Sequence, residues 1–151
     1  MNKLAHIFIW LAFFSSYSAL GEQKKVLVLQ TGSSEFYWTA GQVKGIRESF
    51  ARQSDDTYSI AVEYLDLVRH SDQEYLDALQ NLLLKKYSSN ASDIAGIITS
   101  DDAALDFFVN RLNDHFKSTP LAFSGTNGRI PEELENSGRE FAGLLERPNY
   151  K

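Results

Sequence analysis

The chain has 151 residues, of which 15 are basic and 20 acidic, for a formal net charge of −5, and 43% of its residues are hydrophobic. That length and apolar content suffice for one domain with a buried core. The acidic balance, without any lysine- or arginine-rich run, gives no electrostatic reason to bind nucleic acid, and the lack of cysteine excludes disulfides, thiol catalysis and thiolate metal sites.

Residues 1–21 have the pattern of a secretory signal peptide. A basic start at Lys3 precedes an apolar core at residues 4–14, and small residues before Glu22 suit cleavage there. An apolar core of about 11 residues is too short for a bilayer, which needs roughly 20. The alternative is an uncleaved signal anchor. We therefore expect residues 22–151 to form one α/β lobe in the periplasm or outside the cell.

The first half of this domain predicts two strands and two helices. The apolar run at 24–32 ends in turn residues, as expected of a strand buried on both faces. Residues 39–42 have the T-x-x-Q pattern of a capping box that opens a helix. Residues 58–67 alternate like a strand near a sheet edge, and residues 71–74 form a second capping box. The apolar face of the first helix comprises Val43, Ile46, Phe50 and Ala51.

The second half continues the alternation. Residues 93–99 predict another buried strand, which leads through "SDD" at 100–102 into a helix. A fourth strand at 119–125, a short helix at 131–135 and a fifth strand at 140–146 follow. The apolar face of the third helix comprises Leu105, Phe108, Val109, Leu112 and Phe116.

Such alternation of strands and helices predicts a doubly wound α/β fold with a parallel sheet. The preferred strand order is 2-1-3-4-5, because the second strand has the most exposed pattern. Ligands of such sheets bind beyond the carboxyl ends of the strands, where the strand order reverses. The loops at 32–38 and 100–102 would flank that point, and those at 66–70, 125–129 and 146–147 share the edge. The candidate ligand-binding residues are Ser33, Ser34, Tyr37, Trp38, Asp66, Ser100, Asp101, Asp102, Gly125 and Asn127.

Three consecutive aromatic residues, at 36–38, occupy the first of these loops. They cannot all point into the core, so at least one should be free to stack on a ligand. Alternatively, Phe36 and Trp38 attach the following helix to the sheet.

The adjacent carboxylates of Asp101 and Asp102 allow two interpretations. As an N-cap, Ser100 or Asp101 would accept a backbone N–H and stabilise the helix by roughly 1 kcal/mol, and the helix dipole would favour Asp102 in the first turn. A cap at the point where the strand order reverses can also line a cleft and receive an ammonium or hydroxyl group. The two roles are compatible.

No pattern indicates an enzyme, a cofactor or a metal site. A receiver domain needs an acidic pair after the first strand, where this chain has "QTGSSE". A serine hydrolase elbow of the G-x-S-x-G type is lacking, as are G-x-G-x-x-G and Walker loops. His70 and His115 offer no i,i+4 pair and are expected at the surface.

Five segments together resemble the uncharacterised ABC-transporter substrate-binding family, which has a type I periplasmic-binding fold. The nearest likeness is to the version found as the extracytoplasmic input domain of bacterial sensor histidine kinases. The segments span most of residues 22–151 in order: Tyr37–Ile46, Val62–Leu79, Lys85–Tyr87, Thr99–Phe108 and Phe123–Gly128.

The resemblance implies two lobes that close on a small molecule, with the loops after the first, third and fourth strands on the first lobe's side of the cleft. Some relatives bind aromatic amino acids, so an amino acid or similar polar solute is the implied ligand, and a membrane transporter or kinase module the implied partner. Sensor-type relatives often end the first strand with a His-Ser-Tyr-like segment, where this chain has residues 30–32, "QTG".

By this likeness we expect the chain to be the first lobe of a longer protein. The alternative is a secreted single-domain interaction module without a clamp, and a secreted hydrolase ranks third.

Overall fold

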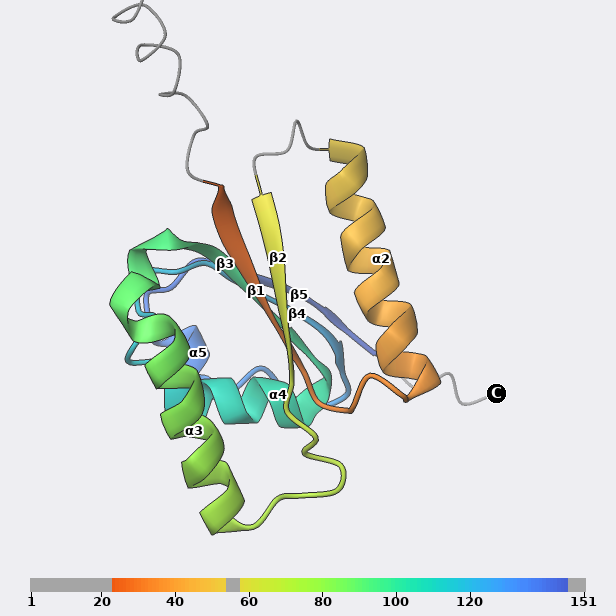
Figure 1. Ribbon diagram of the computed structural model, residues 1–151. Helices are drawn as coiled ribbons and strands as arrows, with labels where there is room; N and C mark the ends of the chain where they lie inside the picture. The colour runs from red at the N-terminus through yellow and green to blue at the C-terminus, as the bar shows by residue number, and fades with distance from the viewer. Residues whose placement is uncertain (1–22, 54–57, 147–151) are drawn as a thin grey trace, which may run out of the picture.

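The computed structural model describes residues 23–53 and 58–146, so the predicted signal peptide lies outside the described residues (Figure 1). Five strands form one sheet in the order β2-β1-β3-β4-β5, and every neighbouring pair is parallel. The predicted strand order is confirmed, with β2 at an edge. The strands are β1 (Lys24–Gln30), β2 (Tyr58–Tyr64), β3 (Ile94–Ser100), β4 (Leu121–Thr126) and β5 (Phe141–Leu145).

Helices cover both faces of the sheet, unequally. The helices are α2 (Tyr37–Gln53), α3 (Gln73–Tyr87), α4 (Asp101–Phe107) and α5 (Glu132–Glu135); a 3₁₀ turn (Ser88–Asp93) follows α3, and a π-helical turn (Phe108–Leu112) extends α4. Figure 1 shows α2 on one face and α3, α4 and α5 on the other. Right-handed crossovers explain this, because only the β1–β2 connection moves toward the β2 edge, while every later connection moves the opposite way.

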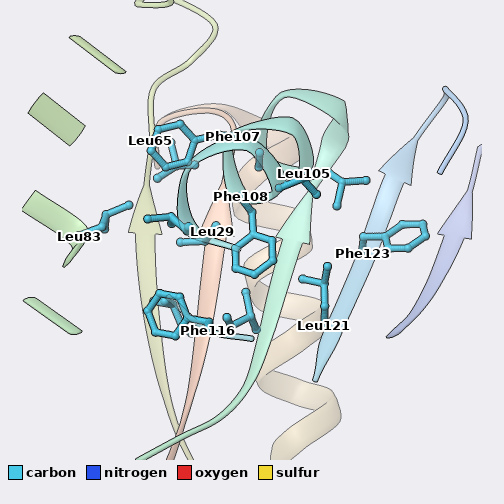
Figure 2. Close-up of a cluster of buried hydrophobic side chains, with 14 of the residues drawn as sticks. Leu29, Leu65, Leu83, Leu105, Phe107, Phe108, Phe116, Leu121 and Phe123 are labelled. Atoms are coloured by element: carbon cyan, nitrogen blue, oxygen red, sulfur yellow. The ribbon is translucent and has the colours of Figure 1, made fainter. Parts of the chain in front are cut away.

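The hydrophobic core lies between the sheet and the pair α3 and α4. Figure 2 shows Phe108 pointing into this cluster near Leu29, with Leu83 contributed by α3. Phe108 and Leu29 are fully buried, and burial of such a side chain stabilises the fold by roughly 1.5 to 3 kcal/mol. The predicted apolar face of the third helix is confirmed, since all five of its members are buried.

The opposite face is sparsely packed. Of the 17 residues of α2, only Thr39 and Val43 are buried, so the predicted apolar face of this helix is only partly used. Beside α2, an apolar hollow of about 500 Å³ extends over β3, β4 and β5, with Phe50 among its lining residues. Four small residues also line it: Ala95, Gly96, Ala122 and Ala142.

Both predicted capping boxes were wrong in detail. Helix α2 begins two residues before Thr39, and the amide of Ala40 already donates to the carbonyl of Phe36 at 2.9 Å. Thr39 instead packs against the first loop, where a Cβ on Gly32 would lie 2.7 Å from its hydroxyl. Helix α3 is capped by Asp72, one residue after the expected Ser71, because the Asp72 carboxylate accepts from the amide of Tyr75 at 3.0 Å.

A polar contact joins α3 to the edge strand β2. The carboxylate of Glu63 accepts hydrogen bonds from Lys86 Nζ at 2.5 Å and from the hydroxyl of Tyr87, which is buried. Burial is the main cause that raises the pKa of the Tyr87 hydroxyl, and the bond to Glu63 adds to it. The folded state therefore favours the neutral phenol.

This contact predicts a loss of stability in alkali. The pKa of Tyr87 is higher in the folded than in the unfolded chain, so its contribution is complete below about pH 10 and falls as the pH rises toward the folded value. Urea unfolding at pH 8 and at pH 10.5 measures how much the free energy of unfolding falls between the two pH values. That fall should be smaller for Tyr87→Phe than for the native chain. The fall should not vanish, because burial also raises the pKa of Tyr75. An unchanged fall would contradict the prediction.

Candidate functional site

The candidate site lies at the carboxyl ends of the strands, where three connections meet. Asp101 begins α4, directly after β3, and its Oδ1 accepts hydrogen bonds from Trp38 Nε1 at 3.3 Å and from Gln42 Nε2 at 3.4 Å. Trp38 and Gln42 belong to the first turns of α2, which follows β1. Because β1 and β3 are neighbours at the point where the strand order reverses, this is the place that the topology favours for a ligand.

Gly125, near the end of β4, forms another wall of the site. A Cβ added to Gly125 would lie 2.5 Å from Asp101 Oδ1 and 3.3 Å from Gln42 Nε2. Its φ of +73° is also one that glycine adopts readily and other residues do not. Glycine therefore lets the backbone of β4 approach the Asp101 carboxylate.

Asp101 itself has an unusual backbone. Its φ is +65°, a left-handed conformation that costs a non-glycine residue roughly 1 to 2 kcal/mol, although aspartate tolerates it better than most. Within the described residues, no lysine, arginine or histidine forms an ion pair with Asp101. The site thus presents a carboxylate that no neighbouring cation neutralises.

The region around the start of α4 is acidic. Burial, together with the negative charge of Asp102, raises the pKa of Asp106 above its ordinary value. Asp101, Asp102 and Asp106 lie within six residues of one another. A positively charged group would therefore be electrostatically favoured there.

A buried network of polar side chains joins the end of β1 to the start of α4, next to the site. The hydroxyl of Ser100 donates to Gln30 Oε1 at 2.5 Å, and the hydroxyl of Thr31 donates to the carbonyl of Ser100 at 2.7 Å. The same Thr31 oxygen accepts from the amide of Ala104 at 3.0 Å. Thr31, which directly follows β1, thus caps α4.

The sequence-based assignment of this cap to Ser100 or Asp101 was therefore wrong. Ser100 makes no side-chain cap bond, because its hydroxyl is buried against Gln30. Asp101 does not cap the helix either, since its carboxylate reaches α2 instead.

Asp102 has a role of its own. Its carboxylate accepts hydrogen bonds from the backbone amides of Asn127, at 3.1 Å, and Gly128, at 3.3 Å. Asp102 and Asn127, two of the candidate ligand-binding residues, thus contact each other, and this contact fixes the loop after β4 against the start of α4.

Four other candidates do not join this cluster. Asp66 holds Arg69 through two contacts, at 2.8 and 2.9 Å, in a turn where the φ of Asp66 is +53°. Ser34 lines a separate hollow of about 360 Å³, which lies beside α2 and is also lined by Tyr64 of β2. Tyr37 is 93% exposed, and the carbonyl of Ser33 accepts from the amide of Phe36 in a local turn.

Gln42 is the site residue that the sequence analysis missed. It was assigned only to the capping pattern, although it lies one helical turn after Trp38 and so shares its helix face. That spacing was the available signal. The Oε1 atom of Gln42 is buried without a hydrogen-bond partner among the described residues.

Within the described ranges, 23–53 and 58–146, no cluster of three or more histidine, aspartate or glutamate residues could hold a metal ion, and no helix is long and apolar enough to span a bilayer. Comparisons with protein-family models, curated proteins and solved structures found no match to the chain.

Proposed function

We propose that this chain is a small-molecule-binding lobe of an extracytoplasmic solute receptor, serving a transporter or a sensor kinase. Its ligand binds at the carboxyl ends of β1, β3 and β4, and a second lobe of the complete receptor closes over it. One observation carries the proposal: Trp38, Gln42, Asp101 and Gly125 converge from separate segments at the point where the strand order reverses. The sequence resemblance to type I periplasmic-binding proteins points the same way.

The chemistry of the site indicates the kind of ligand. Among the described residues, Asp101 supplies a carboxylate without a cationic partner, and Gln42 supplies a buried oxygen without a donor. The ligand should therefore carry N–H or O–H donors, and an ammonium group fits best. The indole of Trp38 is 55% exposed and can stack on the ligand or attract its cation, by about 0.5 to 2 kcal/mol. A small amine or amino acid meets these requirements.

A thermal-shift screen of the chain with the common amino acids and simple alkylamines tests this proposal. A ligand at about 100 times its dissociation constant should stabilise the fold by about 2.7 kcal/mol. Trp38→Ala and Asp101→Asn should abolish that stabilisation while leaving the unliganded melting temperature within a few degrees. Asparagine is the apt substitution because it tolerates a positive φ and removes only the charge.

Asp114→Asn is the matched control, because the Asp114 side chain is 92% exposed and forms a surface pair with Lys117. It should leave the ligand-induced shift unchanged. If Trp38→Ala and Asp101→Asn respond to the ligand as the native chain does, the site has been placed wrongly. If no amine or amino acid shifts the melting, the receptor proposal fails in favour of an interaction module.

A further inference from the structure

Helix α2 physically connects the candidate site to the apolar hollow. Its first turns carry Trp38 and Gln42, which contact Asp101. Its last turn carries Phe50, which lines the hollow and meets the ring of Tyr58 edge-on at 5.9 Å between centroids. This helix of 17 residues thus extends from one end of the strands toward the other (Figure 1).

This helix is weakly attached along its length. Only Thr39 and Val43 are buried, and hollows of about 360 and 500 Å³ lie on its two flanks. Gly41 and Gly45 fall within it, and a Cβ at either position would meet nothing within 4 Å. Each glycine lowers helix propensity by about 1 kcal/mol relative to alanine. By contrast, three of the seven residues of α4 are buried.

The attachment at the site is concentrated on a single atom. In the described chain, two side-chain hydrogen bonds join α2 to the rest of the fold, and both end on Asp101 Oδ1. At 3.3 and 3.4 Å they are longer than the usual N–H···O distance of about 2.7 to 3.2 Å. A group that competes for this oxygen would release both bonds at once.

We propose that α2 is a hinged helix latched at Asp101, and that it transmits the state of the site to the hollow beside Phe50. When the latch is closed, Trp38 and Gln42 hold the start of α2 against the start of α4. When it opens, the helix moves into the space on its flanks, and its Phe50 end shifts over the hollow. That a ligand opens the latch rests on the proposed function; the mechanical link between Asp101 and Phe50 does not.

Hydrogen exchange measured by mass spectrometry tests the link without any ligand, in Asp101→Gly. Glycine removes the carboxylate and suits the φ of +65°, so the variant opens the latch without adding backbone strain. Amide exchange should accelerate about tenfold throughout α2, including residues 46–53, as expected for the loss of one or two net hydrogen bonds. The amides of β1 and β3 should exchange as in the native chain. Gln42→Leu removes one of the two bonds and should give a smaller acceleration.

Asp102→Ala is the matched control, since its carboxylate neighbours Asp101 but binds the amides of Asn127 and Gly128. It should accelerate exchange at residues 127–128 and leave α2 unchanged. Acceleration confined to residues 37–42 in Asp101→Gly would overturn the proposal, because α2 would then be anchored along its length. Equal acceleration in all segments, or the same response of α2 to Asp102→Ala, would overturn it too. A failed ligand screen would leave the exchange result standing.

Discussion

Replacing Gly125 with alanine should lower the free energy of unfolding by about 3 kcal/mol and disrupt the candidate site. At the φ of +73°, a side chain costs roughly 1 to 2 kcal/mol. The new Cβ would also lie 2.5 Å from Asp101 Oδ1, a distance that forces the carboxylate to move and adds overpacking of about 1 to 3 kcal/mol. Urea unfolding measures the first effect, and loss of the ligand-induced thermal shift measures the second.

Gly138 provides the control that separates strain from crowding. Its φ of +67° is nearly the same, but a Cβ there would meet nothing within 4 Å. Gly138→Ala should therefore cost only the conformational part, roughly 1 to 2 kcal/mol. Equal losses in the two variants would mean that β4 relaxes away from Asp101, and that the close approach is not needed.

The architecture was predictable because its signals are local and repeated. Buried parallel strands read as continuous apolar runs, and both β1 and β3 have that pattern, whereas the alternation in β2 indicated an edge. Once strands and helices alternate, right-handed crossovers leave few topologies to choose from. Helical spacing alone predicted the apolar face that includes Phe108, and the residues of that face are buried in the structure.

The details of the site were not predictable in the same way, because they depend on contacts between distant segments. Serine and aspartate before a helix favour a local cap, and the cap of α4 was therefore assigned to Ser100 or Asp101. In the fold, the backbone N–H of Ala104 near the start of α4 donates instead to Thr31, 73 residues earlier in the chain. The left-handed φ of Asp101 then turns its carboxylate toward Trp38, 63 residues away. No pattern within a short window contains that information.

The uneven use of the two faces also escaped the sequence analysis. The periodicity of α2 predicted an apolar face, and Val43 is the one of its four members that is buried. A helical period indicates which side of a helix turns inward, but it does not say how much of the sheet that helix will cover. Here the sheet beside α2 carries small residues such as Ala122, and the hollow remains open.

Phe108→Ala should therefore have a far larger effect than Phe50→Ala, although both remove a phenylalanine ring from a helical segment. Phe108 is fully buried among the sheet, α4 and the guanidinium of Arg139, which lies 5.2 Å from its ring centroid. Its loss should cost about 3 to 5 kcal/mol, a large part of the roughly 5 to 15 kcal/mol that stabilises a typical domain.

Phe50 is only half-buried at the border of the hollow, so Phe50→Ala should cost less than half as much. Urea unfolding followed by circular dichroism compares the two variants directly. Similar losses would show that the α2 face is as tightly packed in solution as the opposite face, which would also remove the physical basis for a hinged α2. A large difference would mean that one face of the sheet holds the fold together, while the helix on the other face is free to respond to the site.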